Sequence, residues 1–493
     1  MSAPKTGEKR PSAEQNPLPG SSGLRTFFLR IHFYIGLFVG PFIFIAALTG
    51  TLYVLTPQLE NRLYAHVLYT DIEGTPQPLS LQVAAAMRVL ANEKNTTLSA
   101  VRPAPSPGET TRVMFSSPDL GPSESRSVFI DPVSLAVKGD LTVYGTSGIL
   151  PFRLWLDNLH RSLLLGSLGR NYSELAASWL WIAALGGAYL WWTGRQSPIN
   201  AKKTDAVRSA RRRLRRRHTV TGLALLAGLL FFSATGLTWS RWAGDNVSQL
   251  RYALGWQTPA VATQLSGSTE PSPHNEHAHH MMMDMPDKTP IDPARFDRVL
   301  ASARAAGIEA RKIEIRPTSK PHRAWTVTEM ERTWPTRADA VAVDPDSGQV
   351  VSKVAFSDFP LAAKLTRWGV DIHMGVLFGW PNQLLLAVFG TGLCMMIVWG
   401  YRLWWLRRPR ASVSNNPLQT VTEAFLSLSL ASRVLVVIVT LGIGIFLPAM
   451  GISAVILMLL DILRWLRYRA SLPTREKDAS GTNTKQGRDN ALS

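Results

Sequence analysis

Four histidines occupy repeated positions in the chain and are candidates to bind a metal. His32 and His218 each begin a membrane-length apolar run, directly after basic residues. His160 and His373 each precede another apolar run. Two imidazoles that converge from facing helices are what a bis-histidine haem iron requires. Ionisable side chains at membrane depth are costly and usually functional, although a histidine at a membrane surface also has the simpler roles of hydrogen-bonding lipid or capping a helix.

The positions repeat because the chain contains an internal duplication. Residues 32–50 (HFYIGLFVGPFIFIAALTG) return as residues 218–236 (HTVTGLALLAGLLFFSATG), with the histidine, the glycine one helical turn later and the Thr-Gly pair in register. Each copy also has an Asp-Pro dipeptide at the same distance before its second histidine, Asp131 before His160 and Asp344 before His373. The second histidines are farther apart in the chain than the first ones, so the second copy contains an insertion between these positions.

The composition indicates a polytopic membrane protein. The 493 residues alternate between long apolar runs and polar segments. A net charge of +18 would suggest nucleic-acid binding in a soluble protein, but the basic residues gather in short loops beside the apolar runs, so we expect no nucleic-acid partner. The single Cys394 excludes an intramolecular disulfide and a cysteine metal cluster. The chain has no Gly-rich nucleotide loop, H-E-x-x-H motif or nucleophile elbow, which argues against a hydrolase or a nucleotide-driven pump.

The expected fold is a polytopic α-helical membrane protein of about six spans with two outer α+β domains. Basic residues mark the short loops and both tails as cytoplasmic, including six arginines between 211 and 217. The localisation is then a bacterial inner membrane, multi-pass, with both termini cytoplasmic and the long polar segments periplasmic. The expected segments are a disordered tail (1–23), span 1 (24–55), outer domain 1 (56–172), span 2 (173–192), a basic loop (193–217), span 3 (218–239), outer domain 2 (240–380), span 4 (381–405), a loop (406–425), a terminal hairpin of two short spans (426–466) and a disordered tail (467–493).

Periodicity predicts similar elements in the two polar segments. The first contains a helical pattern at Leu79–Asn92 and a strand, turn and strand at Arg126–Leu141. The second contains a helical pattern at Pro293–Ala306, an alternating strand at Lys312–Arg316 and a hairpin around Asp344. The Asp-Pro dipeptides therefore favour a structural role as turns between short strands.

The topology sorts the histidines by depth. His32 and His218 lie at cytoplasmic span ends, and His160 and His373 lie at the outer surface. A bilayer core of about 30 Å separates these levels. Pseudo-symmetry brings equivalent histidines to one axis, so we expect His32 and His218 to share one haem and His160 and His373 to share another. Nearby glycines suit either a flat macrocycle or close helix packing; they are Gly36, Gly40, Gly50, Gly222, Gly228 and Gly236.

The insertion in the second copy carries a cluster of histidines and methionines. Imidazole and thioether groups together favour copper. This opens an alternative function as a copper-handling membrane protein, such as a cupric reductase, while a solvated low-complexity loop with adventitious metal affinity explains the same residues. The members of this second candidate metal site are His274, His277, His279, His280, Met281, Met282, Met283 and Met285.

The repeated elements resemble the PepSY-associated transmembrane family. The resemblance covers roughly residues 24–405 and includes the H-x3-G-x12-T-G spans, the Asp-Pro-x-Ser hairpins and the segments LHRSLLLG and IHMGVLFG. It implies that the outer segments are PepSY-like domains, in which a small sheet packs on a helix. Some members of the family are inner-membrane ferric-siderophore reductases that carry haem. The resemblance therefore implies iron uptake and haem b, with ligation by His32, His160, His218 and His373.

The leading hypothesis is a haem-containing metalloreductase of the inner membrane. It would pass electrons to a periplasmic ferric-siderophore or other metal chelate and so release iron. Flavoprotein-fused relatives differ from this chain, in which a polar tail follows Leu466, so we expect a separate electron donor, either a quinol or a cytoplasmic flavoprotein. This chemistry requires no acid–base residue, and none is assigned as catalytic. The alternative from another class is a non-enzymatic membrane protein whose PepSY-like domains bind a peptide or a regulatory partner.

Overall fold

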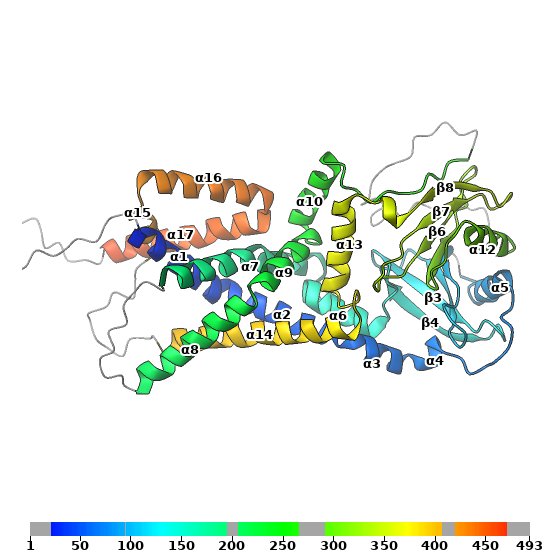
Figure 1. The fold of residues 1–493 in the computed structure, drawn as a ribbon, viewed down its shortest axis with the longest axis horizontal. Helices are drawn as coiled ribbons and strands as arrows, with labels where there is room; N and C mark the ends of the chain where they lie inside the picture. The colour runs from blue at the N-terminus through cyan, green and yellow to red at the C-terminus, as the bar shows by residue number, and fades with distance from the viewer. Residues whose placement is uncertain (1–20, 94, 195–205, 266–290, 407–419, 471–493) are drawn as a thin grey trace, which may run out of the picture.

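The computed structural model describes residues 21–93, 95–194, 206–265, 291–406 and 420–470. Figure 1 shows a helical bundle at one end of the long axis and an antiparallel sheet with its helices at the other. The His/Met-rich segment 274–285 and the two tails predicted to be disordered lie outside the described residues, apart from a few tail residues next to the bundle.

Each copy of the repeat contributes one long broken helix, one short helix and one long straight helix to the bundle. In the first copy these are α1 (Ser21–Tyr34), the π-helical segment η1 (Ile35–Val39), α2 (Gly40–Val54), α6 (Pro151–Ser162) and α7 (Gly166–Gly194). In the second copy they are α8 (Ala206–Ala224), α9 (Leu226–Thr238), α13 (Leu361–His373) and α14 (Trp380–Trp405).

Among the described residues, four helices are long and apolar enough to cross a membrane, and the pair α8–α9, bent by 59°, makes a fifth. The four are Gly23–Val54, Gly166–Gly194, Trp380–Trp405 and Pro448–Arg467. The sixth expected span corresponds to α16 (Leu430–Phe446), which at 17 residues is shorter than the others. The described residues thus support four or five spans, and the sixth is not confirmed.

The terminal apolar block forms a helical hairpin, as its central Pro448 suggests. Helix α16 ends at Phe446 and α17 (Pro448–Ala470) begins at the proline, which cannot donate a backbone hydrogen bond to continue α16. The two helices pack against each other, and α17 packs on α7. A short helix, α15 (Val421–Leu426), joins the hairpin to α1.

Helix α7 begins at Gly166, before the expected start of the second span at position 173. Its first residues are mostly polar, so hydropathy does not mark them as membrane-spanning. They follow a tight turn in which Leu163, Leu164 and Gly166 have positive φ values of 52°, 60° and 56°. This turn separates α6 from α7, so the histidine-bearing helix is an element of its own.

The two polar segments form one continuous eight-stranded antiparallel sheet in the order β4-β3-β2-β1-β5-β6-β7-β8. The strands are β1 (Thr97–Arg102), β2 (Thr111–Ser116), β3 (Glu124–Ile130), β4 (Val137–Tyr144), β5 (Ile313–Arg316), β6 (Trp325–Glu329), β7 (Ala340–Val343) and β8 (Val350–Val354). The copies meet where Val101 on β1 lies opposite Ile315 on β5. Because the copies share a sheet, the expected pair of domains is a single α+β unit with two repeated halves.

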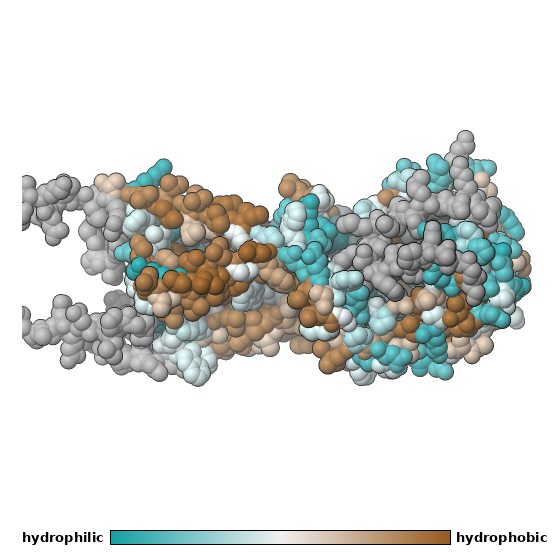
Figure 2. All heavy atoms as spheres, turned by 90° about the horizontal axis from the view of Figure 1, so that it is seen from above, coloured by the Kyte–Doolittle hydropathy of each residue, from teal (hydrophilic) through white to brown (hydrophobic). Residues whose placement is uncertain are grey.

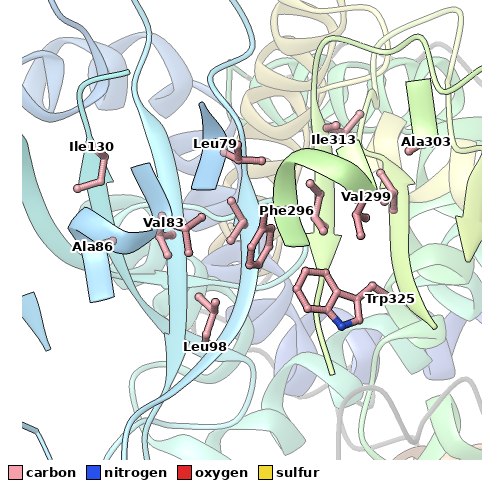
Figure 3. Close-up of a cluster of buried hydrophobic side chains, with 14 of the residues drawn as sticks. Leu79, Val83, Ala86, Leu98, Ile130, Phe296, Val299, Ala303, Ile313 and Trp325 are labelled. Carbon is pink, nitrogen blue, oxygen red and sulfur yellow. The ribbon is translucent and has the colours of Figure 1, made fainter. Parts of the chain in front are cut away.

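Helices α5 (Leu79–Val89) and α12 (Arg295–Ala305) pack on this sheet and contact each other. Their apolar residues recur at helical spacing, which gives each helix one buried face. Figure 3 shows side chains of both halves in one core, including Val83 from α5, Phe296 from α12 and Trp325 from β6. Separating the halves would expose this core, so apolar burial holds them together.

The hydropathy of the surface separates the two ends of the molecule. Figure 2 shows apolar side chains over the helical end and polar side chains around the strands. Leu385 on α14 is 65% exposed and Ile445 on α16 is 78% exposed. Large apolar areas on a surface mark contact with another apolar phase. Together with the long apolar helices, they make the chain a multi-pass membrane protein.

Shorter elements connect the bundle to the sheet. They are α3 (Thr56–Leu63), α4 (Ala65–Leu68), α10 (Trp242–Ala253) and the 3-10 helix η2 (Phe356–Asp358). The buried Glu174 on α7 accepts hydrogen bonds from the backbone N–H groups of Trp242 (2.8 Å) and Ala243 (3.2 Å) at the start of α10. A carboxylate at a helix N-terminus satisfies N–H groups that have no partner inside the helix.

Candidate metal centre in two layers of histidines

The inner pair, His32 on α1 and His218 on α8, lies between the two copies of the repeat. The ring centroids are 6.2 Å apart and the ring planes are inclined at 83°. Two imidazoles that bind one metal ion through nitrogens about 2 Å from the metal have ring centroids about 6 Å apart. The separation of the inner pair therefore matches that of two imidazoles bound to one metal ion.

Hydrogen bonds define the proton positions on the inner pair. Nδ1 of His32 lies 3.0 Å from the carbonyl oxygen of Ala183 on α7, and Nδ1 of His218 lies 3.0 Å from that of Met396 on α14. A carbonyl oxygen only accepts, so each Nδ1 carries the proton and donates it. Each Nε2 then keeps a lone pair that can bind a metal, while the carbonyl fixes the orientation of the ring. Ala183 and Met396 are also equivalent in the repeat, because they are as far apart in the chain as His160 and His373 are.

The outer pair, His160 on α6 and His373 on α13, lies at the end of the bundle nearer the sheet. Nδ1 of His160 is 3.1 Å from the hydroxyl of Thr49, and Nδ1 of His373 is 2.7 Å from that of Thr235. Each hydroxyl donates its own proton to the carbonyl one turn earlier in its helix, at 2.7 and 2.8 Å. With its proton donated to that carbonyl, the hydroxyl oxygen is placed to accept from Nδ1–H, and in this arrangement Nε2 is again the unprotonated nitrogen.

Burial keeps the outer pair neutral. Burial, together with the neighbouring His160, lowers the pKa of His373 to about 3. Burial also lowers the pKa of His160, against the opposing effect of the Asp157 carboxylate. A neutral imidazole is the form that binds a metal. Both outer histidines are thus ligand-competent at physiological pH.

Glycines make room beside three of the rings. A Cβ added to Gly187 would lie 3.1 Å from Cε1 of His32, and one added to Gly50 would lie 3.1 Å from Cε1 of His160. Gly400, equivalent to Gly187 in the repeat, would place its Cβ 3.6 Å from His218. Of the glycines singled out from the sequence, Gly50 borders a histidine ring. Gly36 has nothing within 4 Å of an added Cβ.

The remaining expected glycines serve helix packing. Added Cβ atoms would meet Tyr401 at Gly40 and Phe389 at Gly228. At Gly222 and Gly236 they would meet Met396 and Ala177. Gly187 and Gly400 were missed because they lie outside the histidine–glycine motif. Gly187 and Gly400 are as far apart in the chain as His160 and His373 are, and this equal spacing is the signal that could have identified them.

Both copies depart from regular α-helical geometry just beyond the inner histidine. In the first copy the π-helical η1 ends at Val39. The equivalent position in the second copy is Leu225, where α8 and α9 bend. In the first copy Pro41 lacks the N–H that would bond the carbonyl of Leu37, and the Tyr401 hydroxyl donates to that carbonyl instead, at 2.9 Å. Such irregular turns are frequent at functional sites.

Haem suits these pairs better than a bare metal ion does. Within the described residues, no group of three or more His, Cys, Asp or Glu side chains could hold a metal ion. A zinc site takes three or four protein ligands. A haem iron needs only axial ligands from the protein, because the macrocycle supplies the others. Two neighbouring imidazoles with unprotonated Nε2 atoms therefore fit haem, whereas the His/Met-rich candidate at 274–285 lies outside the described residues.

A family model for the PepSY-associated TM region matches residues 29–407. The chain belongs to this family. The matched residues include all four histidines and every strand of the sheet, and they confirm the resemblance inferred from the repeats. A search of curated proteins finds no match.

The structure also assigns a role to residues that sequence reasoning noted without explaining. The Thr-Gly pair is part of the repeat, and its threonine is the hydrogen-bond partner of the outer histidine in each copy. The backbone partners of the inner pair, Ala183 and Met396, were missed. Nothing in a residue type reveals which carbonyl a distant side chain will reach.

Proposed function

We propose that this protein is a haem-containing reductase of the bacterial inner membrane that passes electrons across the membrane to a ferric-siderophore. The observation that supports this most is the set of four histidines in two layers, each with a hydrogen-bonded Nδ1 and an unprotonated Nε2. His32 and His218 would hold one haem b, and His160 and His373 would hold the other. The protein would then carry one redox centre near each membrane face.

A haem b in each layer would supply an iron that gains and loses one electron. The chain contributes the surroundings. The imidazoles hold the iron, and the hydrogen bonds at Nδ1 orient the rings and raise the basicity of Nε2. His32 and Thr49 define the two layers on one long helix, and the rise of the helix between them is roughly 26 Å. The apolar bundle between the layers excludes water.

The basic loops argue for electron flow from the inner pair to the outer pair. A quinol or a cytoplasmic flavoprotein would give up electrons at the inner face. One electron delivered at the outer face would convert Fe(III) in the chelate to Fe(II). Hard oxygen ligands hold Fe(II) less tightly, so iron would leave the siderophore. The sheet lies on the outer side in this orientation.

Reporter fusions test the orientation. Fusions at Ser197 and Ser414 should report the cytoplasm, and fusions at Ser117 and Ser268 should report the periplasm. These positions sample both sides of the membrane in both copies of the repeat. A cytoplasmic signal at Ser117 would reverse the proposed direction of electron flow.

A reduced-minus-oxidised absorption spectrum of the purified protein, with haem quantified per chain, tests the function. We expect two haem b groups per chain, and re-oxidation of the dithionite-reduced protein on addition of a ferric-siderophore. Absence of haem would overturn the proposal and favour a non-enzymatic binding protein. Re-oxidation by a cupric chelate but not by a ferric one would favour the copper alternative.

A further inference from the structure

Buried charged side chains lie where the outer histidine pair meets the sheet. Arg153, Asp157 and His160 follow one face of α6, at helical i, i+4 and i+7 positions. A rise of 1.5 Å per residue places Arg153 about 10 Å from His160. This direction is toward the sheet, because Leu150, directly before α6, packs with Phe129 and Val143 of the sheet. Arg153 is only 8% exposed.

The guanidinium of Arg153 is short of hydrogen-bond partners. Its Nη1 lies 3.7 Å from Glu60 Oε2, which is beyond hydrogen-bond distance. The other oxygen of Glu60 accepts from the backbone N–H of Leu150 at 2.6 Å. Nε and Nη2 of Arg153 are buried and have no hydrogen-bond partner among the described residues. A buried cation with unused donors is unfavourable unless a ligand meets them.

Tyr53 places a second unused donor beside Arg153. The guanidinium carbon of Arg153 lies 4.7 Å from the centre of the Tyr53 ring. The Tyr53 hydroxyl is buried and likewise has no hydrogen-bond partner within the described part of the chain. Tyr53 follows Thr49, the partner of His160, by one helical turn on α2. The unused donors of α2 and α6 thus lie on the sheet side of the same histidine.

The second copy of the repeat lacks both donors. The positions equivalent to Tyr53 and Arg153 are Trp239 and Thr366. Trp239 packs against His373, with ring centroids 5.9 Å apart. The Thr366 hydroxyl donates to the carbonyl of Ala362 at 2.7 Å and is satisfied. On α13 of the second copy, the unpartnered buried donors among the described residues, Nε of Arg367 and Nε1 of Trp368, belong to other positions.

The charged groups in this region include the Glu60 carboxylate, which forms a long ion pair with Arg153 at 3.7 Å, and Arg367 on α13, whose Nε is buried. Arg332, in the loop after β6, is paired with Asp371, to which its Nε donates at 2.6 Å. Asp157 lies on the same face of α6 as Arg153, and burial raises the pKa of its carboxyl group. Arg153 therefore keeps two donor nitrogens, Nε and Nη2, for a carboxylate closer than Glu60.

We propose that Arg153 and Tyr53 form a carboxylate-binding site for the propionate groups of the haem held by His160 and His373. This inference rests on the proposed function. Haem b carries two carboxylates on one edge of an otherwise apolar macrocycle. The guanidinium can donate two parallel N–H groups to one carboxylate, and the phenol can donate its hydroxyl. Arg153 and Tyr53 are both buried, which suits a resident carboxylate better than that of a diffusing chelate.

Haem transfer to apomyoglobin tests the site through retention rather than activity. The rate of haem transfer would be measured for the purified protein and for Arg153→Gln. Each protein would carry haem b or, after reconstitution, haem b dimethyl ester, whose propionates carry no charge. We expect Arg153→Gln to speed loss of the outer haem b about tenfold or more, and to leave loss of the ester unchanged. Arg153→Lys keeps the positive charge but not the paired N–H groups of the guanidinium, so its rate of haem loss should be intermediate. Tyr53→Phe should speed haem loss less than Arg153→Gln does.

Matched outcomes separate the possible failures. Arg126→Gln removes a partly exposed arginine paired with Asp140 at 2.7 Å and should leave haem transfer unchanged. Equal acceleration of haem b and ester loss by Arg153→Gln would assign Arg153 a purely structural role and overturn the inference. A raised KM for the ferric chelate with unchanged haem retention would assign the carboxylate to the substrate and also overturn it. A wild-type protein without haem would instead defeat the proposed function.

Discussion

Both histidine pairs leave Nε2 available for a metal, but different groups accept the proton on Nδ1. In the inner pair, backbone carbonyls of α7 and α14 accept the Nδ1 proton. In the outer pair, threonine hydroxyls of α2 and α9 accept it. A backbone carbonyl is positioned by helix packing and persists whatever side chain its residue carries. A hydroxyl can be removed by a single substitution, so the outer pair is the more open to evolutionary change.

The surroundings of the pairs differ in symmetry as well. Ala183 and Met396 occupy equivalent places around the inner pair. Around the outer pair, Tyr53 and Arg153 of the first copy face unlike residues in the second. Duplication has thus preserved the geometry that positions the rings, and divergence has gathered on the side facing the sheet. Substitutions at the matched histidines and threonines should therefore act alike in the two copies, whereas substitutions on the sheet side of the outer pair should act unequally.

Removal of one histidine ligand should have the largest effect on haem content. His32→Ala and His218→Ala should each abolish the same haem component, and the double variant should lose no more. His160→Ala and His373→Ala should abolish the other component. All four variants should lose electron transfer to a ferric chelate, because a gap at either layer breaks the path. Redox-resolved spectra with haem quantified per chain measure the components.

An exposed histidine provides the control for these variants. His66 on α4 lies outside both pairs, and His66→Ala should retain both haems. If His32→Ala and His373→Ala remove the same component, the pairing by depth is wrong. If all four variants keep full haem, the proposed ligation is wrong altogether.

Loss of a threonine hydroxyl should weaken only the outer haem. Thr49→Val or Thr235→Val removes the acceptor of the Nδ1 proton, and loss of such a partner typically costs about 10–100-fold in metal affinity. Thr51→Val is the matched control, because the Thr51 hydroxyl donates to the carbonyl of Ala47 and does not contact a histidine. Haem dissociation rates, resolved by component, provide the measurement. Equal weakening by Thr51→Val would contradict a specific role for the hydroxyl.

The sequence predicted much of this arrangement because its strongest signals are local. Apolar run length located the spanning helices, and the fixed offsets of the repeat identified the four histidines and which of them are equivalent. The strands β3, β4 and β5 lie where alternation predicted them. Each of these features is visible as a run length, an alternation or a fixed spacing along the chain.

Features that depend on distant residues could not be predicted in the same way. The joining of the two halves of the sheet depends on β1 meeting β5, which belongs to the other copy of the repeat, and no local pattern reports that contact. The break between α6 and α7 passes through leucines with positive φ, which carry no turn signal. The unused donors of Arg153 and Tyr53 become visible only when α2 and α6 are packed together.

A methyl group added beside the inner pair should disturb haem binding less than loss of a hydrogen bond does. In Gly187→Ala the new Cβ would lie 3.1 Å from His32 Cε1, so the ring must move by a few tenths of an ångström. We expect both haems to remain and the spectrum and midpoint potential of the inner one to shift. Gly186→Ala is the control, since its Cβ would be 4.0 Å from the same ring and both substitutions raise helix propensity equally. Identical shifts in the two variants would show that crowding of the ring is not the cause.

Deletion of residues 273–286 should have the smallest effect on either pair. These residues belong to the insertion of the second copy, and the first copy carries the same histidine motif without them. Haem per chain and the rate of ferric-chelate reduction should therefore match those of the intact protein. Copper bound per chain, measured by mass spectrometry on the same samples, should fall if the His/Met-rich segment binds copper. Loss of the outer haem would instead place an iron ligand in the insertion, and the duplication would then no longer account for that layer.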